Sequence, residues 1–506
     1  MKKLALISVS DKTNIKEFAG ELVSLGYEIL ATGNTAKLLN ESGTGCTEIS
    51  SFASFPEIFE GRVKTLQPRV FGGILMRRDI EQDIREAEEN NILPIDIVCV
   101  NLYPFPQVVK REDLDLATKI ENIDIGGPSL IRASAKNYKF VSVLTDPSQY
   151  EGFLSELKSS GQVSIETRQR LAKDAFSYTS YYDTLIANFL EKEFSCPADS
   201  IRINQKLVQS LRYGENPHQA AGVYGDFFDY FQILHGKEIS YNNIVDLVAA
   251  VELINDLGKN SCAIIKHTNA CGAAAGTSAL DAYSKALSCD PVSAFGGIVA
   301  FNSVVDAETA EKLNEIFLEI VYAPDFTAEA LQILEKKKNR RLVKGIKELP
   351  RNYVTVKTIP GGLIAQERDN SVLTDDLLKT VTKRSVTPAE LDDLRFAWVI
   401  SKHTKSNAIV FAKNQMILGV GAGQTSRVDS VRIAIQKAKE HGHDLQGSVA
   451  ASDAYFPFPD GVQEIAAAGS AAIIQPGGSV RDEESISAAN ENNVAMIFTS
   501  IRNFKH

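Results

Sequence analysis

Residues 4–35 decide the fold of the N-terminal part, and their sequence is LALISVSDKTNIKEFAGELVSLGYEILATGNT. The apolar run at 4–9 predicts a buried strand. Apolar residues at helical spacing over 15–23 predict a helix. A second strand is predicted over 27–31, directly ahead of the segment TGNT at 32–35. Strands that alternate with helices predict an α/β fold with a parallel, doubly wound sheet.

The same alternation continues along the next part of the chain. Further strands are predicted over 95–100 and 140–144, and a long helix rich in Tyr and Phe over 166–194. A looser, Pro-containing stretch at 195–200 predicts a domain boundary. The predicted domains are 1–196 and 200–506. Because ligands of doubly wound sheets bind at the carboxyl ends of the strands, we expect the chemistry in the loops after these strands.

Length and composition are those of an ordinary globular protein. The chain has 506 residues, which suggests about three folding units. Hydrophobic residues make up 44% and charged residues 23%, so the disordered and fibrous classes are excluded. The formal net charge is −10, which argues against a protein that coats nucleic acid.

Cysteine usage and hydropathy predict a cytoplasmic protein. Six cysteines without a CxxC pair are too sparse for a disulfide framework or a zinc knuckle. No apolar run approaches the roughly 18 residues that span a bilayer. The N-terminal apolar run stops at Asp11-Lys12 without a small-residue cleavage site, so we expect a first strand there and not a signal peptide. Neither a membrane nor a nucleic acid is expected as a partner.

Several cofactor motifs are absent from the sequence. There is no GxxxxGK[ST] loop, and the segment GVGAG at 419–423 lacks the GxGxxG spacing of dinucleotide-binding proteins. The pair His441 and His443 lies in a polar helix end, and the HxE…PCxxC pattern of zinc deaminases is missing. ATPases, dehydrogenases and zinc hydrolases are therefore excluded, and no metal is expected in the chemistry.

Two loops after predicted strands have the composition of a phosphate site. Segment 8–13, SVSDKT, and segment 32–35, TGNT, each supply hydroxyl groups, and each opens a predicted helix. Helix N-termini bind anions through free N–H groups and the helix dipole. The alternative for either loop alone is N-capping by Ser or Thr. Their repetition at one sheet edge favours the phosphate site.

Four further N-terminal groups suit proton transfer. All seven histidines lie at 218 or later, so an N-terminal active site must use Lys, Tyr, Asp, Glu or Cys. The candidates are Lys64 in GRVKTL (61–66), Tyr103 in NLYPF (101–105), Asp124 in IDIGGP (123–128) and Lys136. A partly desolvated lysine near another cation has a lowered pKa and moves protons near neutrality. Taken singly, each candidate is better explained as a surface lysine, a core tyrosine or part of a tight glycine turn.

The C-terminal part contains a faint internal duplication. Lys-His-Thr occurs at 266–268 and again at 402–404, an offset of 136 (402 against 266), each time after an apolar run and ahead of a predicted helix and strand. Three residues alone match by chance, but the shared order of elements favours a tandem repeat. Between the two copies, the charge run at 335–341 predicts a solvated helix end.

Lys266 and His267 are the candidates for chemistry in this part. Histidine titrates near neutrality and suits a general base, and an adjacent lysine suits a developing oxyanion. Because neighbouring strand residues point to opposite faces, both serve one site only if the backbone turns, and the segment ACG at 270–272 predicts that turn. The alternative is a core histidine beside a lysine that reaches solvent. The polar segment RYGENPHQ at 212–219 is typical of a binding loop.

Ten sequence blocks occur in order between residues 4 and 504. They are SVSDKT (8–13), GRVKTL (61–66), NLYPF (101–105), IDIGG (123–127), AKN (135–137), LRYGENPHQ (211–219), KHTN (266–269), CDPVSAFGGIVA (289–300), GVGAGQTSR (419–427) and SDAYFPFPD (452–460). Together they resemble the bifunctional phosphoribosylaminoimidazolecarboxamide formyltransferase / IMP cyclohydrolase family.

For the N-terminal domain, the resemblance implies a fold similar to methylglyoxal synthase and the cyclohydrolase reaction. Formylated aminoimidazole carboxamide ribotide (FAICAR) closes to IMP with loss of water when its carboxamide nitrogen attacks the formyl carbon. Lys136 would take or relay a proton, Asp124 and Lys64 would orient and polarise the reacting groups, and Tyr103 matches a fourth catalytic position. The positions that match substrate contacts are Lys12, Thr13, Thr32, Gly33, Thr35, Arg62, Thr65, Asn101 and Gly126.

For the C-terminal domain, the resemblance implies two cytidine-deaminase-like subdomains, at about 200–370 and 385–506, without the zinc. They transfer the formyl group of the cosubstrate 10-formyltetrahydrofolate to the 5-amino group of aminoimidazole carboxamide ribotide (AICAR). His267 would be the base, Lys266 the electrostatic stabiliser, and Asn407 would assist at the amine. AICAR positions are matched by Arg212, Tyr213, Gly296, Glu319, Arg427, Tyr455 and Arg502, and folate positions by Val428, Asp460, Ser479, Val480 and Phe504.

Four residues depart from the family's pattern. Asn34 replaces a glycine, Gln67 and Phe71 replace histidines, and Ala270 replaces a proline that would stiffen the turn carrying His267. None is a predicted catalytic position, and Asn tolerates left-handed backbone. The resemblance also implies a homodimer whose ligands are AICAR, FAICAR, IMP and the folate. The alternatives are a non-catalytic purine nucleotide sensor, and a chain that retains only one of the two activities.

Overall fold

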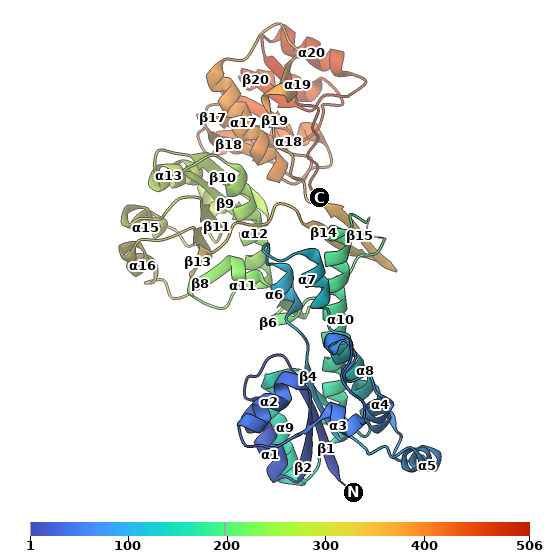
Figure 1. The fold of residues 1–506 in the computed structure, drawn as a ribbon. Helices are drawn as coiled ribbons and strands as arrows, with labels where there is room; N and C mark the ends of the chain where they lie inside the picture. Colours follow the sequence, from blue (N-terminus) through green and yellow to red (C-terminus); the bar gives the residue numbers. More distant parts are fainter. Residues whose placement is uncertain (1, 197–198) are drawn as a thin grey trace. The chain divides into compact units, whose positions relative to one another are not determined.

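The chain folds into two compact units, Met1–Gln205 and Lys206–His506, in a computed structural model that describes residues 2–196 and 199–506 (Figure 1). The division between the units falls after Gln205, a few residues beyond the predicted boundary segment. Residues 197 and 198 of that segment lie outside the described residues. Among the described helices, none combines the length and the apolar composition that a bilayer span requires.

A five-stranded parallel sheet forms the centre of the first unit. Its strands are β1 (Lys3–Val9), β2 (Tyr27–Ala31), β3 (Thr47–Glu48), β4 (Ile97–Asn101) and β5 (Ser142–Leu144), in the order β3-β2-β1-β4-β5. Every pairing is parallel, and Ala5 of β1 lies opposite Ile29 on one side and Ile97 on the other. This confirms the parallel sheet predicted from residues 4–35. The strands predicted at 95–100 and 140–144 are present, but each begins two residues later.

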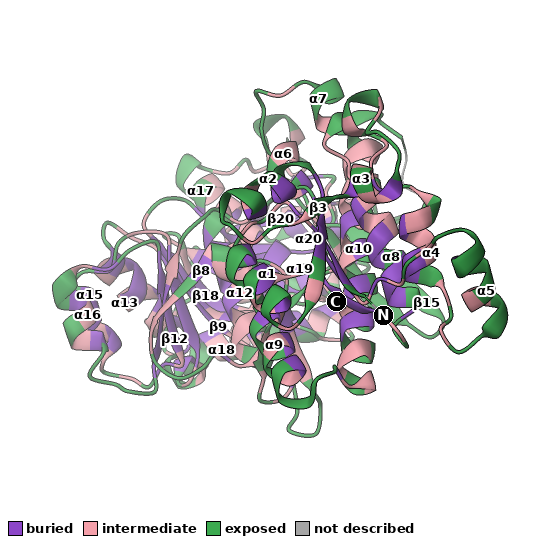
Figure 2. Cartoon of the chain, turned by 60° about the horizontal axis from the view of Figure 1, so that its bottom comes forward, coloured by how far each residue is buried: buried purple, intermediate pink, exposed green. Residues whose placement is uncertain are grey.

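Helices cover both faces of this sheet. Residues 4–7 of β1 are all at most 1% exposed, although neighbouring side chains of a strand point to opposite faces. A strand buried on both faces is typical of a parallel sheet between two helical layers, and Figure 2 colours each residue of the chain by its burial. The helices are α1 (Ile15–Ser24), α2 (Gly33–Glu41), α3 (Ile49–Ala53), α4 (Pro68–Leu75), α5 (Glu81–Glu89), α6 (Phe105–Val109), α7 (Leu116–Glu121), α8 (Gly126–Lys136), α9 (Tyr150–Ser160) and α10 (Ile165–Glu193).

The long helix α10 agrees with the prediction of 166–194 to within one residue at each end. Ser164 caps its first turn, because its hydroxyl accepts the N–H of Thr167. The tyrosines on its inner face reach two loops of the first unit. The hydroxyl of Tyr178 accepts the N–H of Leu102 at 3.1 Å, and the hydroxyl of Tyr182 accepts the N–H of Asp124 at 2.9 Å. The helix therefore holds the loops that carry two candidate catalytic residues.

A twelve-stranded mixed sheet forms the centre of the second unit. Its strands follow the order β16-β21-β20-β19-β17-β18-β10-β9-β11-β12-β13-β8. Their bounds are β8 (Phe231–His235), β9 (Ser261–Lys266), β10 (Asn269–Ala275), β11 (Ile298–Phe301), β12 (Ile320–Ala323), β13 (Arg341–Gly345), β16 (Lys379–Thr380), β17 (Ile409–Lys413), β18 (Met416–Gly421), β19 (Val449–Ser452), β20 (Ala472–Gln475) and β21 (Ala495–Phe498). Two separate hairpins are β6 (Leu207–Leu211) with β7 (Ala221–Tyr224), and β14 (Val354–Ile359) with β15 (Gly362–Glu367).

The second unit consists of two repeats with the same order of elements. The first contains α12 (Tyr241–Asp256), β9, β10, α13 (Ala279–Cys289), β11, α15 (Ala307–Leu313), β12, α16 (Ala328–Leu334) and β13. The second contains α17 (Pro388–His403), β17, β18, α18 (Arg427–Glu440), β19, α19 (Asp460–Ala467), β20, α20 (Asp482–Glu491) and β21. Short helices α11 (Phe227–Tyr230) and α14 (Pro291–Ala294) lie outside this pattern. The strand order reads the same from either end, and the antiparallel pair β10–β18 joins the repeats.

The residues on which the duplication was predicted are not its true counterparts. Lys266 ends strand β9, whereas Lys402 and His403 end helix α17. The capped helices α12 and α17 give the real offset, which is 147 (N-cap Thr387 against N-cap Ser240). The three-letter match fails because an identical tripeptide at the end of an apolar run does not distinguish a strand from a helix.

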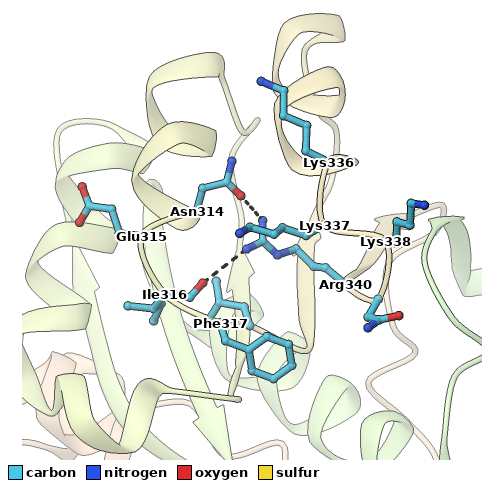
Figure 3. A pocket seen from close by; sticks show the side chains of 10 residues that line it. Asn314, Glu315, Ile316, Phe317, Lys336, Lys337, Lys338 and Arg340 are labelled. Atoms are coloured by element: carbon cyan, nitrogen blue, oxygen red, sulfur yellow. Dashed lines mark hydrogen bonds between the residues drawn. The ribbon is translucent and has the colours of Figure 1, made fainter.

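The charge run at 335–341 is only partly solvated, contrary to the prediction. Helix α16 ends at Leu334, and the side chain of Arg340 is 2% exposed. Its guanidinium donates to the Asn314 side chain at 2.6 Å and to backbone carbonyls of residues 313 and 316 at the end of α15. Figure 3 shows Arg340 pointing to Asn314. Both residues line a cavity of about 390 Å³. The arginine is buried because it caps carbonyls that a helix end leaves unpaired.

Candidate active sites

The candidate residues of the first unit gather where its parallel strands end. Loop 8–13 follows β1, loop 32–35 follows β2, and Asn101 ends β4. These three strands are neighbours and parallel, so their carboxyl ends meet at one edge of the sheet. The edge is therefore the place where a ligand of this unit is expected.

Hydroxyl groups from two loops meet at this edge. The hydroxyls of Ser8 and Thr32 lie 2.8 Å apart, and the ammonium of Lys12 donates to the hydroxyl of Thr35 at 2.8 Å and to the carbonyl of Val9. Burial lowers the pKa of Lys12. A half-buried cation among hydroxyl groups suits a phosphate, which would replace the water that Lys12 has lost.

The Ser and Thr hydroxyls of loops 8–13 and 32–35 do not cap the first turns of α1 and α2. The N-cap of α1 is Asn14, the N-cap of α2 is Thr32, and neither side chain accepts a helix N–H. Thr13 instead donates to the carboxylate of Asp11 at 2.7 Å. The alternative explanation of these loops as ordinary side-chain N-caps is therefore wrong. The N–H groups of Ile15 and Thr35 donate to the backbone carbonyls of Lys12 and Thr32, so an anion would bind the other first-turn N–H groups of the two helices.

Asn101 ties two loops of the edge together. Its side-chain carbonyl accepts the N–H groups of Ser10 at 2.5 Å and Asp11 at 2.8 Å, and its amide donates to the carbonyl of Asp11 at 3.1 Å. The residue is only 7% exposed. In this structure the Asn101 side chain therefore shapes loop 8–13, the first of the two predicted phosphate loops.

Lys64 lies beside the first turn of α2. Its ammonium pairs with the carboxylate of Glu57 at 2.9 Å, and a Cβ added to Gly33 would lie 3.2 Å from it. Arg62 differs, because its guanidinium forms an exposed ion pair with Glu121 at the end of α7. Lys64 thus shares the edge with the phosphate loops, while Arg62 is engaged elsewhere.

Asp124 bonds to the first turn of helix α8, which begins at the glycines that were predicted to form a tight turn. Its carboxylate accepts the N–H of Gly127 at 2.7 Å, in the first turn of α8. Burial raises the pKa of Asp124, and hydrogen bonds from the backbone of Gly127 and Tyr103 oppose that rise. A Cβ on Gly126 would lie 2.8 Å from the hydroxyl of Thr65, so the glycines permit a close approach to two predicted site residues.

Lys136 does not join this group. It ends α8, ten residues after Gly126, which places it roughly 15 Å along the helix axis. There it lines a cavity of about 760 Å³ together with Phe71, Phe176 and other residues of α4, α8 and α10. Its assignment to the cyclohydrolase site stays a prediction, and the departure at Phe71 lies beside it.

In the second unit, strand directions bring most candidates to one edge of the twelve-stranded sheet. Strand β9 ends at this edge, so its antiparallel neighbour β11 and the parallel β12 begin there. Strand β10 also begins there, so its antiparallel neighbour β18 ends there and β17 begins there. The parallel strands β19, β20 and β21 also end there. The candidates at or just beyond these strand ends are Lys266, His267, Gly296, Glu319, Asn407, Arg427, Val428, Tyr455, Asp460, Ser479, Val480, Arg502 and Phe504.

Lys266 and Glu319 are held by contacts within the first repeat. The ammonium of Lys266 donates to the carbonyl of Phe295 at 2.9 Å, next to Gly296. The carboxylate of Glu319 pairs with Arg341 at 2.8 Å. Both groups are therefore in place before a ligand binds, and each keeps hydrogen-bonding capacity for one.

His267 lies in the turn itself, not before it as predicted. His267 and Thr268 form a two-residue hairpin between β9 and β10, with φ of 54° and 64°. The predicted turn at 270–272 is instead an irregularity within β10, where the register shifts, and Ala270 pairs with Ile265 in the ladder. Because the chain reverses at His267, strand alternation no longer separates its side chain from that of Lys266. His267 is exposed at the sheet edge.

Arg427 and Asn407 belong to a buried polar network in the second repeat. The guanidinium of Arg427 donates to the side-chain carbonyl of Asn407 and to the hydroxyl of Ser452, both at 2.7 Å, and pairs with the carboxylate of Asp453. The side chains of Arg427 and Asp453 are 6% and 0% exposed. The Asn407 amide also donates to the carbonyl of Gln424 at 2.8 Å. The network fixes both candidates rigidly.

Of the remaining candidates, Tyr213, Val428 and Ser479 are half-buried and most of the others are exposed. The guanidinium of Arg502 lies 4.5 Å from the ring centre of Phe504, which is 43% exposed, and Val480 is fully exposed. Arg212 and Tyr213 lie in the loop of the β6–β7 hairpin, with the guanidinium 5.7 Å from the ring centre. An exposed aromatic residue with a cation on its face suits a flat heterocyclic ligand.

The candidates of one chain are too far apart to surround one small ligand. Glu319 precedes β12 and Asn407 precedes β17, and these strands are five positions apart in the sheet. At roughly 4.8 Å per spacing, the separation is about 24 Å. His267 is nearer to Asn407, since the neighbouring Asn269 accepts the N–H of Lys405 at 2.9 Å.

Sequence reasoning missed three carboxylates of these sites. Glu57 pairs with Lys64, Asp453 pairs with Arg427, and Asp246 in α12 accepts two N–H groups of the His267 turn. Asp453 had a signal, because it follows a buried strand within the block SDAYFPFPD. Nothing in the sequence distinguishes Asp246 from the other two carboxylates of α12, Glu252 and Asp256. Within the described part of the chain, no group of three or more His, Cys, Asp or Glu side chains is arranged to hold a metal ion.

Comparisons with known proteins agree with both units. The family described as AICARFT/IMPCHase bienzyme matches residues 134–437, and the MGS-like domain matches residues 14–129. The bifunctional purine biosynthesis protein PurH of Persephonella marina is 50% identical over 519 residues, which cover all of both chains. The proteins of the same name from Caldicellulosiruptor saccharolyticus and Bacillus mycoides are 49% and 48% identical, again over the full length of both chains. The chain therefore belongs to the AICARFT/IMPCHase bienzyme family.

Proposed function

We propose that this chain catalyses both reactions of its family with the two groups of residues described above. The second unit transfers the formyl group of 10-formyltetrahydrofolate to the 5-amino group of AICAR. The first unit closes the resulting FAICAR to IMP with loss of water. The observation that carries the proposal is that full-length relatives named bifunctional purine biosynthesis protein match this chain from end to end, while each unit has its own candidate site.

In the first unit, the phosphate of FAICAR would bind at the free helix N–H groups near Lys12. Lys64 lies beside α2 and would polarise the formyl oxygen, and the buried Asp124 would orient the carboxamide nitrogen that attacks the formyl carbon. The new C–N bond forms as the carboxamide nitrogen loses one proton to the formyl oxygen. The formamido nitrogen then loses a second proton, its bond to the formyl carbon becomes a double bond, and the C–O bond breaks so that the oxygen leaves as water. Tyr103 would relay the protons, whereas Lys136 ends α8 roughly 15 Å along the helix and stays outside this group.

In the second unit, the 5-amino group of AICAR is a weak nucleophile because its lone pair is drawn into the ring system. His267 would take a proton from this amine as the C–N bond to the formyl carbon forms, and Lys266 would stabilise the oxyanion. The carbonyl of Asn407 has a second lone pair for the amine, since Arg427 uses only one. The bond from the formyl carbon to N10 of the folate then breaks, and N10 receives the proton.

We further propose that the enzyme works as a homodimer in the cytoplasm. A separation of about 24 Å between Glu319 and Asn407 exceeds the length of a ribotide, so a second copy would bring the two groups around one ligand. All six cysteines are free, as expected of a protein in a reducing compartment. Val428, Asp460, Ser479, Val480 and Phe504 would contact the folate.

An ultraviolet assay with AICAR and 10-formyltetrahydrofolate tests the proposal. Unmodified protein should form IMP, and His267→Ala should lose formyl transfer while it still cyclizes FAICAR supplied directly. Failure of the unmodified protein to turn over either substrate, with the nucleotide still bound, would favour the sensor. Cyclization without formyl transfer would leave only the activity of the first unit.

A further inference from the structure

We infer that Asp246 is a positioning residue for formyl transfer, because its carboxylate fixes the backbone of the turn that carries His267. The inference rests on the role of His267 proposed above and extends it. Asp246 lies in helix α12, and no motif of the sequence pointed to it.

The turn at His267 is built from unfavourable residues. A two-residue hairpin with positive φ at both positions is normally made by Asn-Gly or a similar pair, because other residues resist left-handed backbone. Here the two positions are His267, with φ of 54°, and Thr268, with φ of 64°. Thr268 is branched at Cβ, and such residues rarely adopt positive φ. A conformation of this kind persists only where its surroundings impose it.

Asp246 supplies most of that constraint. One carboxylate oxygen accepts the N–H of His267 at 3.2 Å, and the other accepts the N–H of Thr268 at 2.7 Å. The carbonyl of His267 accepts the Thr268 hydroxyl at 2.7 Å and the Asn269 amide at 3.0 Å. Asp246 therefore holds both N–H groups of the turn from a neighbouring helix, and the direction of the His267 side chain follows from that backbone.

The second repeat contains the same device without a histidine. There the turn residues are Asn414 and Gln415, with φ of 53° and 52°, and their N–H groups donate to Asp393 of α17 at 2.8 Å and 2.6 Å. The offset is 147 for each counterpart (393 against 246, 414 against 267), as it is for the helix caps. The carboxylate clamp is thus a feature of the repeat, and the first repeat uses it to present His267.

The turn at Asn414 and Gln415 does not lie at the edge of the sheet where the candidate residues gather. Strand β17 is antiparallel to β18 and β19, so it ends at the opposite edge of the sheet from β9. Asp393 therefore provides a matched control, since it has the same geometry and no candidate residue depends on it.

The test compares Asp246→Asn with Asp393→Asn in the full chain. An amide presents one acceptor oxygen and one N–H donor where two acceptors are needed, so the turn must shift. Displacing a catalytic group by about 1 Å lowers turnover roughly 100-fold. We expect Asp246→Asn to lower kcat of formyl transfer about 10- to 100-fold, with KM for AICAR changed less than about threefold. Asp393→Asn should keep kcat within about twofold although it destabilises the second unit at least as much.

Two further variants separate positioning from loss of structure. Thr268→Gly removes the residue that most resists positive φ, so Asp246→Asn/Thr268→Gly should recover much of the lost turnover. Adding Asp246→Asn to His267→Ala should cause no further loss, because both act through one group. Cyclization of FAICAR by the same preparations shows that the first unit is intact, and the fluorescence of Trp398 during urea unfolding reports on the second unit.

The outcomes are distinguishable. Equal losses in Asp246→Asn and Asp393→Asn, or an unchanged kcat in Asp246→Asn, would overturn the role of Asp246. Additive losses with His267→Ala would also overturn it. A lack of formyl transfer in the unmodified protein would instead overturn the proposed function, and with it the reason to position His267.

Discussion

Gly127 lies where two side chains leave no room for a third. A Cβ at this position would be 2.5 Å from a carboxylate oxygen of Asp124 and 2.6 Å from the side chain of Leu102. Because Leu102 is buried, Asp124 is the group that must move in Gly127→Ala. We expect this variant to lower cyclization of FAICAR by roughly 10-fold or more, while formyl transfer by the second unit is unchanged.

Gly152→Ala in α9 is the control for this substitution. A Cβ added there meets no heavy atom within 4 Å, and alanine favours a helix over glycine by about 1 kcal/mol. Both rates should stay at the unmodified value. Normal cyclization in Gly127→Ala would show that Asp124 does not act where the proposal places it.

Asp453 is the only carboxylate within reach of the buried guanidinium of Arg427 among the ion pairs of the described residues. In Asp453→Asn the charge of Arg427 would remain buried without a counter-ion, which typically destabilises a protein by about 3–5 kcal/mol. Arg427 would also be freer to leave Asn407, so formyl transfer should fall. Urea unfolding followed by the fluorescence of Trp398, the single tryptophan, measures the stability of the second unit.

The pair between Arg432 and Glu464 is the control for Asp453. Its side chains are 58% and 39% exposed, and exposed pairs contribute at most about 1 kcal/mol. Glu464→Gln should therefore shift the urea midpoint little. Equal destabilisation by the two substitutions would contradict the argument from burial.

At the scale of elements, the sequence predicts the helices and strands whose positions follow from the spacing of apolar residues. Helix α10 and the strands of the first unit follow from apolar spacing, and the parallel sheet follows from their alternation with helices. The two loops predicted to bind phosphate stand out in the sequence because hydroxyl residues follow strand ends there. That their hydroxyls do not cap the helices is set by contacts such as Ser8 with Thr32, which join different loops.

The sequence placed this turn at 270–272 instead of at His267, also because a contact between distant segments decides it. Short-range rules look for Gly, Asn or Asp in hairpin turns, and His-Thr has none of these. The turn forms because Asp246, from a helix 21 residues earlier in the chain, accepts its N–H groups. A tertiary contact thus overrides local preference, and one sequence alone does not display such contacts. The separation of Lys136 from Asp124 follows from the length of helix α8, which the sequence analysis did not predict.

The ends of α12 and α17 share a buried charge cluster that predicts acid sensitivity. The carboxylate of Asp256 pairs with the ammonium of Lys402 at 3.1 Å and with the ring of His403 at 2.9 Å. Burial lowers the pKa of His403, despite its bond to Asp256, and His403 and Lys402 lower the pKa of Asp256 against the effect of burial. Both groups therefore bind protons less tightly in the folded than in the unfolded chain.

Stability of the second unit should accordingly fall as the pH falls. For His403 the loss begins as the pH drops below the unfolded pKa of about 6.5, and for Asp256 it begins below about 4. Thermal unfolding between pH 7.5 and pH 5 should show a falling Tm in the unmodified protein. His403→Gln keeps an amide donor for Asp256 and does not titrate, so its Tm should fall less over this range. A Tm that rises on acidification would contradict the assigned direction.

At the scale of the whole molecule, the repeat explains why one edge of the large sheet collects the candidates. The two repeats are antiparallel where β10 meets β18, so one edge receives the β9–β10 turn of the first repeat and the strand ends of the second. The opposite edge receives the Asn414 turn instead. The two turns thus lie at opposite edges of the sheet, and the candidate catalytic residues lie at only one of these edges.

A subunit-complementation experiment tests whether this edge needs a second copy. If Glu319 of one chain and Arg427 of another contact the same ligand, a dimer of Glu319→Gln with Arg427→Ala contains one site with both substitutions and one with neither. Co-expression of the two inactive variants with different tags, followed by purification through both tags, isolates that mixed dimer. Its formyl transfer should reach about half of the unmodified rate, since one of its two symmetric sites is intact. If each chain formed its own site, every site would carry one substitution and the mixed dimer would be as inactive as its parents. Sedimentation at micromolar protein, where a monomer would contradict the proposed assembly, accompanies the measurement. Cyclization by the same dimer should stay at the unmodified rate, because neither substitution lies in the first unit.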